Sequence, residues 1–141
     1  MPTLIPYHCF VADRNNGLHN LGAHPLRLAL SNRPPRVASD RTLADFKEIA
    51  TGNGYPVGGL PVSVTGSVQR AGVYRLACAN VRVVALGGAL PHFRYAGLYN
   101  SFPTGGLLIG YLDYGSPGIT LAEGNELVVE FDQAAGILTD Q

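Results

Sequence analysis

Apolar residues recur with a period of two through the second half of the chain, residues 60–131. Near the start of this region Val62 and Val64 alternate with Ser63 and Thr65. Such alternation is typical of half-buried β-strands. We predict strands at residues 60–69, 73–78, 81–85, 92–99, 107–114 and 126–131, separated by glycine-rich turns. Strands spaced at roughly ten residues favour an antiparallel β-sandwich or jelly roll over an α/β fold.

The first part of the chain adds one strand and one helix to this series. Leucine at every second position from Leu26 to Leu30 predicts a strand. Thr42 is a candidate N-cap with Asp45 in the capping-box position, and apolar residues then recur on one helical face. We therefore predict an all-β fold, jelly-roll-like or a related antiparallel β-sandwich, with one short helix at about residues 42–51. Residues 107–114 are apolar on both faces, which indicates a central strand or a subunit contact.

Residues 1–24 form an N-terminal arm with little regular patterning, and residues 25–141 form a single β-sandwich domain in this interpretation. The arm around residues 10–21 fits either a short helix or an ordered loop. It is too apolar to remain in water, so it packs on its own sandwich or crosses to a neighbouring copy. We favour the second alternative, because extended arms with prolines rarely complete a sheet interior.

Charge is scarce in this chain of 141 residues. Charged residues make up 14% of it, against roughly 25% in average soluble domains, and the net charge is zero. We therefore expect no nucleic-acid partner. The apolar runs are shorter than a membrane span, so we expect no membrane partner either. Low charge leaves sheet edges unguarded, which favours self-association as a dimer or trimer.

Residues that could carry chemistry are few and poorly spaced. The four histidines lack the spacing of metal ligands and are interpreted as loop or interface residues. Cys9 and Cys78 are far apart and lack the setting of a nucleophile. The glycines at residues 52–59 follow a helix instead of preceding one, unlike a phosphate-binding loop. We expect no catalytic residue, no cofactor and no metal, and hence no enzyme.

Two groups of residues leave alternatives open. Arg82, Arg94, Glu126 and Glu130 lie in predicted strands and either form cross-strand ion pairs or contact a partner. Aromatic residues between 93 and 99 either pack in the core or form a patch that stacks sugars or contacts protein. The candidate protein-interface residues are Leu4, Ile5, Tyr7, Phe10, Arg82, Arg94, Glu126 and Glu130.

Several segments appear in an order that covers nearly the whole chain. They are residues 17–20 (GLHN), 45–55 (DFKEIATGNGY), Gly58-Gly59, 93–100 (FRYAGLYN), 108–115 (LIGYLDYG), Phe131-Asp132 and Gly136-Ile137. Together they resemble a family of small virion proteins from tailed bacteriophages, whose nearest functional likeness is to jelly-roll-like capsid cement or decoration proteins. The chain departs from the usual pattern in its early prolines, Pro2 and Pro6, and in residues 33–36.

This resemblance implies a structural virion protein that binds the major capsid protein on the outside of the shell and stabilises the shell. It implies no catalytic residues. Its location would be the virion, at the capsid surface, after synthesis in the host bacterial cytoplasm. The alternative is a tail, head-fibre or receptor-binding component whose loops bind glycan or protein.

Overall fold

The computed structural model describes residues 3–131 and 138–140. Its elements in chain order are β1 (Ile5–Pro6), α1 (His8–Asn15), β2 (Leu26–Ser31), α2 (Leu43–Phe46), β3 (Leu60–Val62), β4 (Val64–Arg70), β5 (Val73–Cys78), β6 (Val81–Val84), β7 (Tyr95–Asn100), β8 (Leu107–Asp113), β9 (Glu126–Val129) and β10 (Leu138–Asp140). Two parts of the resemblance, Asp132 and Gly136-Ile137, lie outside the described residues.

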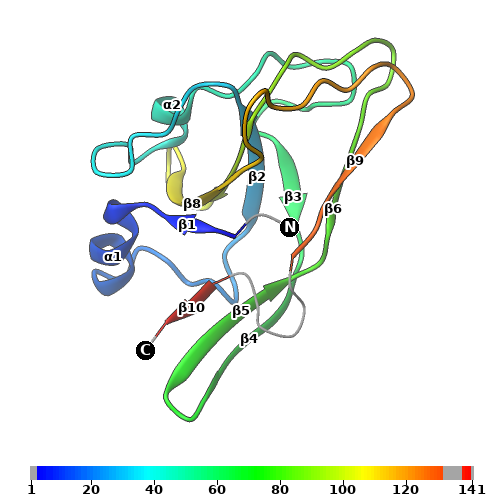
Figure 1. The fold of residues 1–141 in the computed structure, drawn as a ribbon. Coiled ribbons are helices and arrows are strands. Elements are labelled where there is room, and N and C mark those ends of the chain that lie inside the picture. The colour runs from blue at the N-terminus through cyan, green and yellow to red at the C-terminus, as the bar shows by residue number, and fades with distance from the viewer. Residues whose placement is uncertain (1–2, 132–137, 141) are drawn as a thin grey trace.

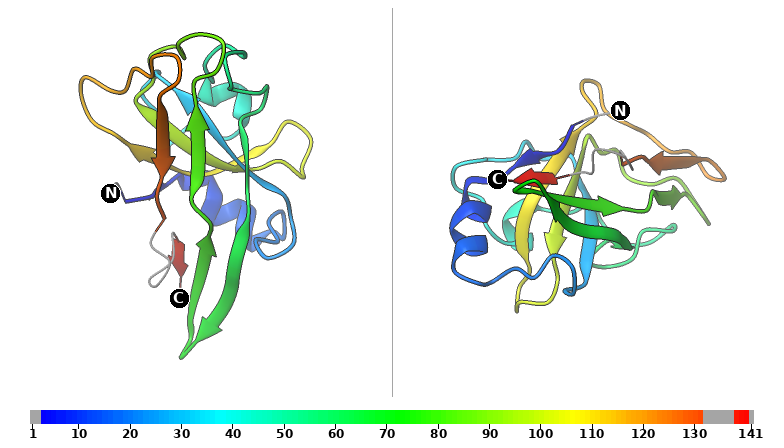
Figure 2. Two further views of the ribbon diagram at one scale, coloured as in Figure 1. Left: turned by 90° about the vertical axis from the view of Figure 1, so that its right-hand side faces the viewer. Right: turned by 90° about the horizontal axis from the view of Figure 1, so that it is seen from below.

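The described strands form three antiparallel sheets, which confirms the predicted all-β, sandwich-like fold (Figure 1). The largest sheet has the strand order β1-β8-β7-β2-β3, a second has the order β10-β5-β4, and β6 pairs with β9. The single strand predicted at residues 60–69 is divided, because the chain passes from the first sheet to the second between β3 and β4. The β4–β5 hairpin extends away from the rest of the molecule (Figure 2).

Strands β7 and β8 are buried on both faces of the five-stranded sheet. On one face, Leu98 and Ile109 belong to the main core, which also contains residues of β5, β6 and β9. On the other face, Tyr99 and Leu108 pack with Phe46 of α2. The two apolar faces noted for residues 107–114 are therefore both covered within this chain.

The predicted helix at about residues 42–51 is wrong in length, because α2 has four residues. Its start is as expected, with Thr42 as the N-cap of a capping box. Its early end has a tertiary cause. The hydroxyl of Ser31 on β2 lies 3.0 Å from the Phe46 carbonyl and 2.7 Å from the Lys47 carbonyl, and Lys47 adopts a left-handed φ of 60°. Contact with β2 thus replaces the next helical turn.

The N-terminal arm is more regular than expected and packs on its own chain. It contains both β1, which pairs with β8, and α1. Tyr7 is 0% exposed and Phe10 is 2% exposed. Gly110 on β8 permits this packing, since a Cβ there would lie 2.9 Å from both the Leu4 Cγ and the Ile5 carbonyl oxygen. The preference for an arm that crosses to a neighbour is therefore wrong for Tyr7 and Phe10.

Two buried carboxylates pair with arginines of the loop that precedes α2. Asp13 on α1 accepts hydrogen bonds from the Arg41 Nε at 3.3 Å and Nη2 at 3.0 Å. Asp40 accepts one from the Arg33 Nη1 at 2.8 Å, and the same nitrogen donates to the Asp45 carbonyl. Both carboxylates are at most 5% exposed. Because buried charges need partners of this kind, the Asp13–Arg41 pair holds α1 against this loop, whereas the Arg33–Asp40 pair holds the loop itself.

Candidate functional site

Three loops lie side by side at the top right of Figure 1. We call this surface the loop end: residues 52–58, 85–90 and 121–125. Backbone hydrogen bonds join its parts, from the Leu86 nitrogen to the Asn53 carbonyl at 2.9 Å and from the Leu90 nitrogen to the Leu121 carbonyl at 3.0 Å. The loop end is thus held by hydrogen bonds between its loops.

Apolar side chains stand out of the loop end into solvent. Val57 is 76% exposed and Leu86 is 61% exposed. Exposed apolar side chains are common on protein surfaces, but two of them on a hydrogen-bonded platform can be buried by a partner without reorganising the loops. This makes the loop end a candidate protein-binding surface.

Three of the four charged residues predicted for an interface form ion pairs within the chain. Arg82 and Glu126 form a cross-strand ion pair at 3.0 Å, with side chains 70% and 42% exposed. Arg94 donates to both carboxylate oxygens of Asp113, at 2.7 and 3.1 Å, and so lowers the pKa of Asp113 below its usual value. Glu130 is exposed. Their contact with a partner stays a prediction.

The apolar residues predicted for an interface divide into two pairs. Leu4 is half-buried against the main core, and Ile5 is 40% exposed. Both of them leave some surface for a partner. Tyr7 and Phe10, in contrast, are interior residues and are not available to one.

The aromatic residues of the segment at 93–99 do not form a surface patch. Phe93 belongs to the main core, whereas Tyr95 and Tyr99 pack on the opposite face of the sheet, and all three are at most 5% exposed. The core alternative is therefore correct, and a sugar-stacking patch at this position is wrong.

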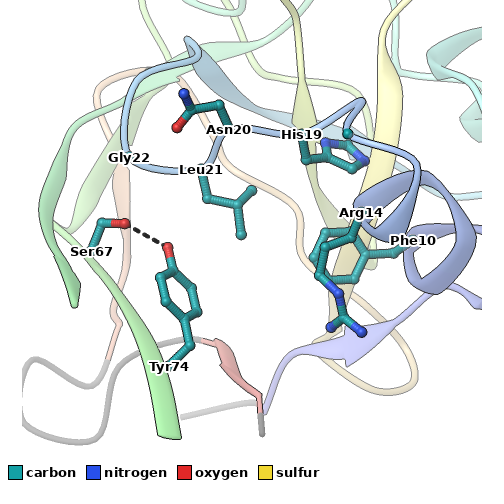
Figure 3. A pocket seen from close by; sticks show the side chains of 9 residues that line it. Phe10, Arg14, His19, Asn20, Leu21, Gly22, Ser67 and Tyr74 are labelled. Atoms are coloured by element: carbon teal, nitrogen blue, oxygen red, sulfur yellow. Dashed lines mark hydrogen bonds between the residues drawn. The ribbon is translucent and has the colours of Figure 1, made fainter. Parts of the chain in front are cut away.

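A pocket of about 480 Å³ opens between α1, the loop after it and the β4–β5 hairpin (Figure 3). Phe10, Arg14 and His19 line one side of it, and Ser67 and Tyr74 line the opposite side (Figure 3). The hydroxyls of Ser67 and Tyr74 lie 2.7 Å apart. The remaining lining residues are Gly17, Asn20, Leu21 and Gly22.

His19 is the least satisfied polar group of this pocket. Its Nδ1 lies 3.2 Å from the Asn100 Nδ2, while its Nε2 is buried without a hydrogen-bond partner among the described residues. Burial also lowers the pKa of His19, which keeps the ring neutral near pH 7. Sequence reasoning assigned His19 to a loop or an interface and missed the pocket. The one feature of the sequence that singled out His19 was its place in the GLHN segment, residues 17–20.

The cysteines lie in settings unlike that of a nucleophile. Cys78 is fully buried, and burial raises its pKa to about 11. Burial raises the pKa of Cys9 as well. A low pKa marks a reactive thiol, so both are interpreted as packing residues. Within residues 3–131 and 138–140, no three His, Cys, Asp or Glu side chains gather as they would to hold a metal ion.

Neither helix in the described part of the chain has the length and apolarity needed to cross a bilayer. No protein-family model matches the sequence. No curated protein matches it, and no solved structure resembles it closely enough to count as a match.

Proposed function

We propose that this protein is a structural virion protein that decorates the outside of a tailed-phage capsid and stabilises the shell. The observation that carries the proposal is the loop end, where Val57 and Leu86 are presented to solvent on hydrogen-bonded loops. The low share of charged residues supports it, because a surface with few charges loses little hydration when another protein covers it. The order of segments that resembles small virion proteins gives the class of partner, the major capsid protein.

The energetics of such a contact suit a repeating surface. Full burial of a valine or leucine side chain stabilises a contact by about 1.5–3 kcal/mol, and the loss of free motion on association opposes this gain. A single contact through Val57 and Leu86 is therefore weak. On a shell with many equivalent sites, oligomeric clamping raises the overall affinity. Binding to assembled shells but not to free capsid subunits then stabilises the shell by RT ln(1 + [L]/Kd) at each site, where [L] is the free concentration of this protein and Kd its dissociation constant from the shell.

Charged residues beside the loop end would act at the rim of this contact. The Arg82–Glu126 ion pair lies on β6 and β9, and Glu126 directly follows the last residue of the loop end. Exposed ion pairs contribute little to affinity, but charges at a rim set orientation and association rate. Glu130 comes after the opposite end of β9, away from the loop end. We therefore assign Arg82 and Glu126, and not Glu130, to the specificity of this contact.

The proposal can be tested with capsids purified without the protein. Added wild-type chain should raise the temperature at which these shells melt. The double variant Val57→Ser, Leu86→Ser should lose most of this protection while folding normally, because both side chains are exposed. Val11→Ser is the matched control, since Val11 is 51% exposed but lies on α1. Full protection by the double variant would contradict the role of the loop end.

We extend the proposal to self-association through β4. This strand is an edge of its sheet. Its central residues 65–69 contain no charged residue and no proline, the residue types that prevent pairing with another strand. The same edge of a second copy can pair with it, and this two-fold contact gives a dimer, whereas a trimer needs a second surface. Val68→Lys, which places a charge on this edge, should shift sedimentation equilibrium toward the monomer. A wild-type protein that stays monomeric at high concentration, in solution and on the shell, would contradict this extension.

A tail, head-fibre or receptor-binding component is the second candidate. The pocket beside His19 favours it, because a decoration protein needs no pocket of this size. Such components occur in few copies per particle, whereas decoration proteins cover the whole shell. Copy number in the virion therefore separates the two candidates.

A further inference from the structure

Asn100, the last residue of β7, contacts two histidines of the segment between α1 and β2. Its side chain is fully buried, and its amide oxygen accepts a hydrogen bond from the Phe102 nitrogen at 3.0 Å, which fixes the orientation of the amide. The amide nitrogen therefore faces the Nδ1 atoms of His19 and His24, at 3.2 and 2.9 Å. Its two hydrogens serve both contacts, with each Nδ1 as the acceptor. The Asn20 backbone nitrogen also donates to the His24 Nδ1, at 3.1 Å.

These hydrogen bonds require both imidazole rings to be neutral, because a protonated ring carries an N–H on each nitrogen and has no acceptor atom. A protonated His24 would turn its Nδ1 hydrogen toward two donors, the Asn100 amide and the Asn20 nitrogen. A protonated His19 would have two N–H groups without an acceptor, since its Nε2 is already buried without a partner among the described residues. Buried donors without acceptors cost free energy, so protonation opposes this arrangement.

The groups packed around His19 do not offset this cost. Asp13 on α1 is a carboxylate that acts on His19, but both of its oxygens already accept hydrogen bonds from Arg41. Burial is the main reason why the pKa of His19 is lowered, and the neighbouring His24 lowers it further. The other charged, titratable or aromatic groups that line the same space are Phe10, Arg14 and Tyr74. None of these three brings a negative charge near pH 7 that would favour a protonated ring.

Phe102 lies against the second histidine. The His24 and Phe102 rings are stacked, with centroids 4.2 Å apart. A cation on an aromatic face gains some attraction, but the gain is small at an exposed site, and Phe102 is 66% exposed. This attraction also leaves the two donors at the His24 Nδ1 in place. Protonation of His24 therefore also works against its contact with Asn100.

The segment at residues 17–24 covers the main core and forms one wall of the pocket. Leu21 is 8% exposed and belongs to the main core. The segment runs from the α1 side of the pocket to the β4–β5 hairpin, where a Cβ on Gly22 would lie 2.9 Å from the Ser67 Oγ (Figure 3). The Asn100 amide connects this segment to β7 through both histidines. Loss of these contacts would loosen the wall and uncover Leu21.

We propose that Asn100, His19 and His24 form a pH-sensitive latch, in which protonation of the histidines releases residues 17–24 from β7 and opens the pocket beside them. The released segment binds more protons than the attached one. Its opening equilibrium therefore rises by up to about tenfold per proton for each pH unit below about 6.5, the ordinary pKa of histidine, until the attached form is protonated as well. The latch does not depend on the position of the protein in a virion.

Hydrogen exchange of the full chain, followed by NMR between about pH 7.5 and 5.5, tests the latch. The reporters are the backbone amides of Ala23 and His24, which donate to the Asn20 carbonyl at 3.0 and 2.8 Å. Their protection factors, taken relative to free peptides at the same pH, should fall by about tenfold from about pH 6.5 to 5.5. They should also stay below those of the β2–β7 ladder, which report global unfolding. Protection that does not change with pH, or exchange of the segment only together with the ladder, would overturn the proposal.

Variants test which groups sense the pH. The double variant His19→Gln, His24→Gln keeps an acceptor for each Asn100 hydrogen but has no ring to protonate, so it should lose the pH response. His8→Gln is the matched control and should keep the response, because His8 is exposed and lies on α1. Asn100→Asp should reverse the response, since a carboxylate accepts hydrogen bonds from protonated rings and protection then rises as the pH falls.

The double variant decides the matter if Asn100→Asp does not fold. A double variant that responds to pH like the wild type would overturn the proposal. A folded Asn100→Asp variant whose segment still opens in acid would overturn it as well.

Discussion

Two substitutions of Tyr7, a residue of the N-terminal arm, should have opposite effects on the stability of the fold. The first of them tests whether the arm is part of the core. The ring of Tyr7 is 0% exposed, and its centroid lies 5.4 Å from that of Tyr111. Its backbone nitrogen donates to the Ile109 carbonyl at 3.0 Å. Removal of a buried aromatic ring costs about 3–5 kcal/mol. Tyr7→Ala should therefore remove a large part of the free energy of unfolding, which is about 5–15 kcal/mol for a typical domain.

Tyr7→Phe should have the opposite sign. The Tyr7 hydroxyl is buried and has no hydrogen-bond partner among the described residues. Burial also raises the pKa of Tyr7 far above its ordinary value, so the phenol is neutral in the folded protein. An unsatisfied buried hydroxyl costs about 1–3 kcal/mol, part of which phenylalanine should recover while keeping the packing of the ring. We expect a gain of about 1 kcal/mol.

Urea denaturation followed by circular dichroism measures both effects. Val11→Ala is the control, because Val11 on α1 is 51% exposed and its substitution should change stability by at most about 0.5 kcal/mol. If Tyr7→Ala unfolds at the same urea concentration as Val11→Ala, the arm does not belong to the core. If Tyr7→Phe is instead destabilised by about 1 kcal/mol, the hydroxyl has a partner and the reasoning about its burial is wrong.

Three further outcomes can be checked by denaturation of single variants. Gly97→Ala would place a Cβ 2.7 Å from the Phe46 ring and should cost about 1–3 kcal/mol, whereas Gly66→Ala, whose nearest contact would be 3.7 Å, should be close to neutral. Because the pKa of His19 is lowered on folding, stability should be highest above the unfolded value, about 6.5, and should fall as the pH drops below it; His19→Gln should flatten this slope. Asp45→Asn should cost about 1 kcal/mol at pH 7, and since the pKa of Asp45 is lowered in the fold, the difference should vanish as the pH falls below about 3.8.

Local patterning was sufficient to predict most of the strands. The leucines at 26, 28 and 30 all enter the main core, since a strand sends every second side chain to the same face. The helix after Thr42 shows where local patterning fails. Its start depends on neighbours in sequence, which the capping box reveals, but its end depends on Ser31 of another element. No pattern within residues 42–51 contains that contact.

The candidate pocket depends even more on long-range contacts. His19 meets Asn100 across 81 positions of the sequence, and Ser67 and Tyr74 come from a separate hairpin. Spacing rules for metal ligands or catalytic nucleophiles could not have found these pocket residues, because the pocket contains neither a set of metal ligands nor a nucleophile motif. The arm was misjudged for a similar reason. The space that Leu4 and Ile5 fill is left by Gly110, far along the chain.

The proposed function is tested most directly by the number of copies of this protein in purified phage particles. Quantitative mass spectrometry of washed particles gives this number relative to the major capsid protein. A decoration protein covers every equivalent position of the shell, so the account predicts a fixed ratio of the same order as the number of capsid subunits or their clusters. Absence from the particles, or a few copies confined to one vertex or the tail, would contradict it.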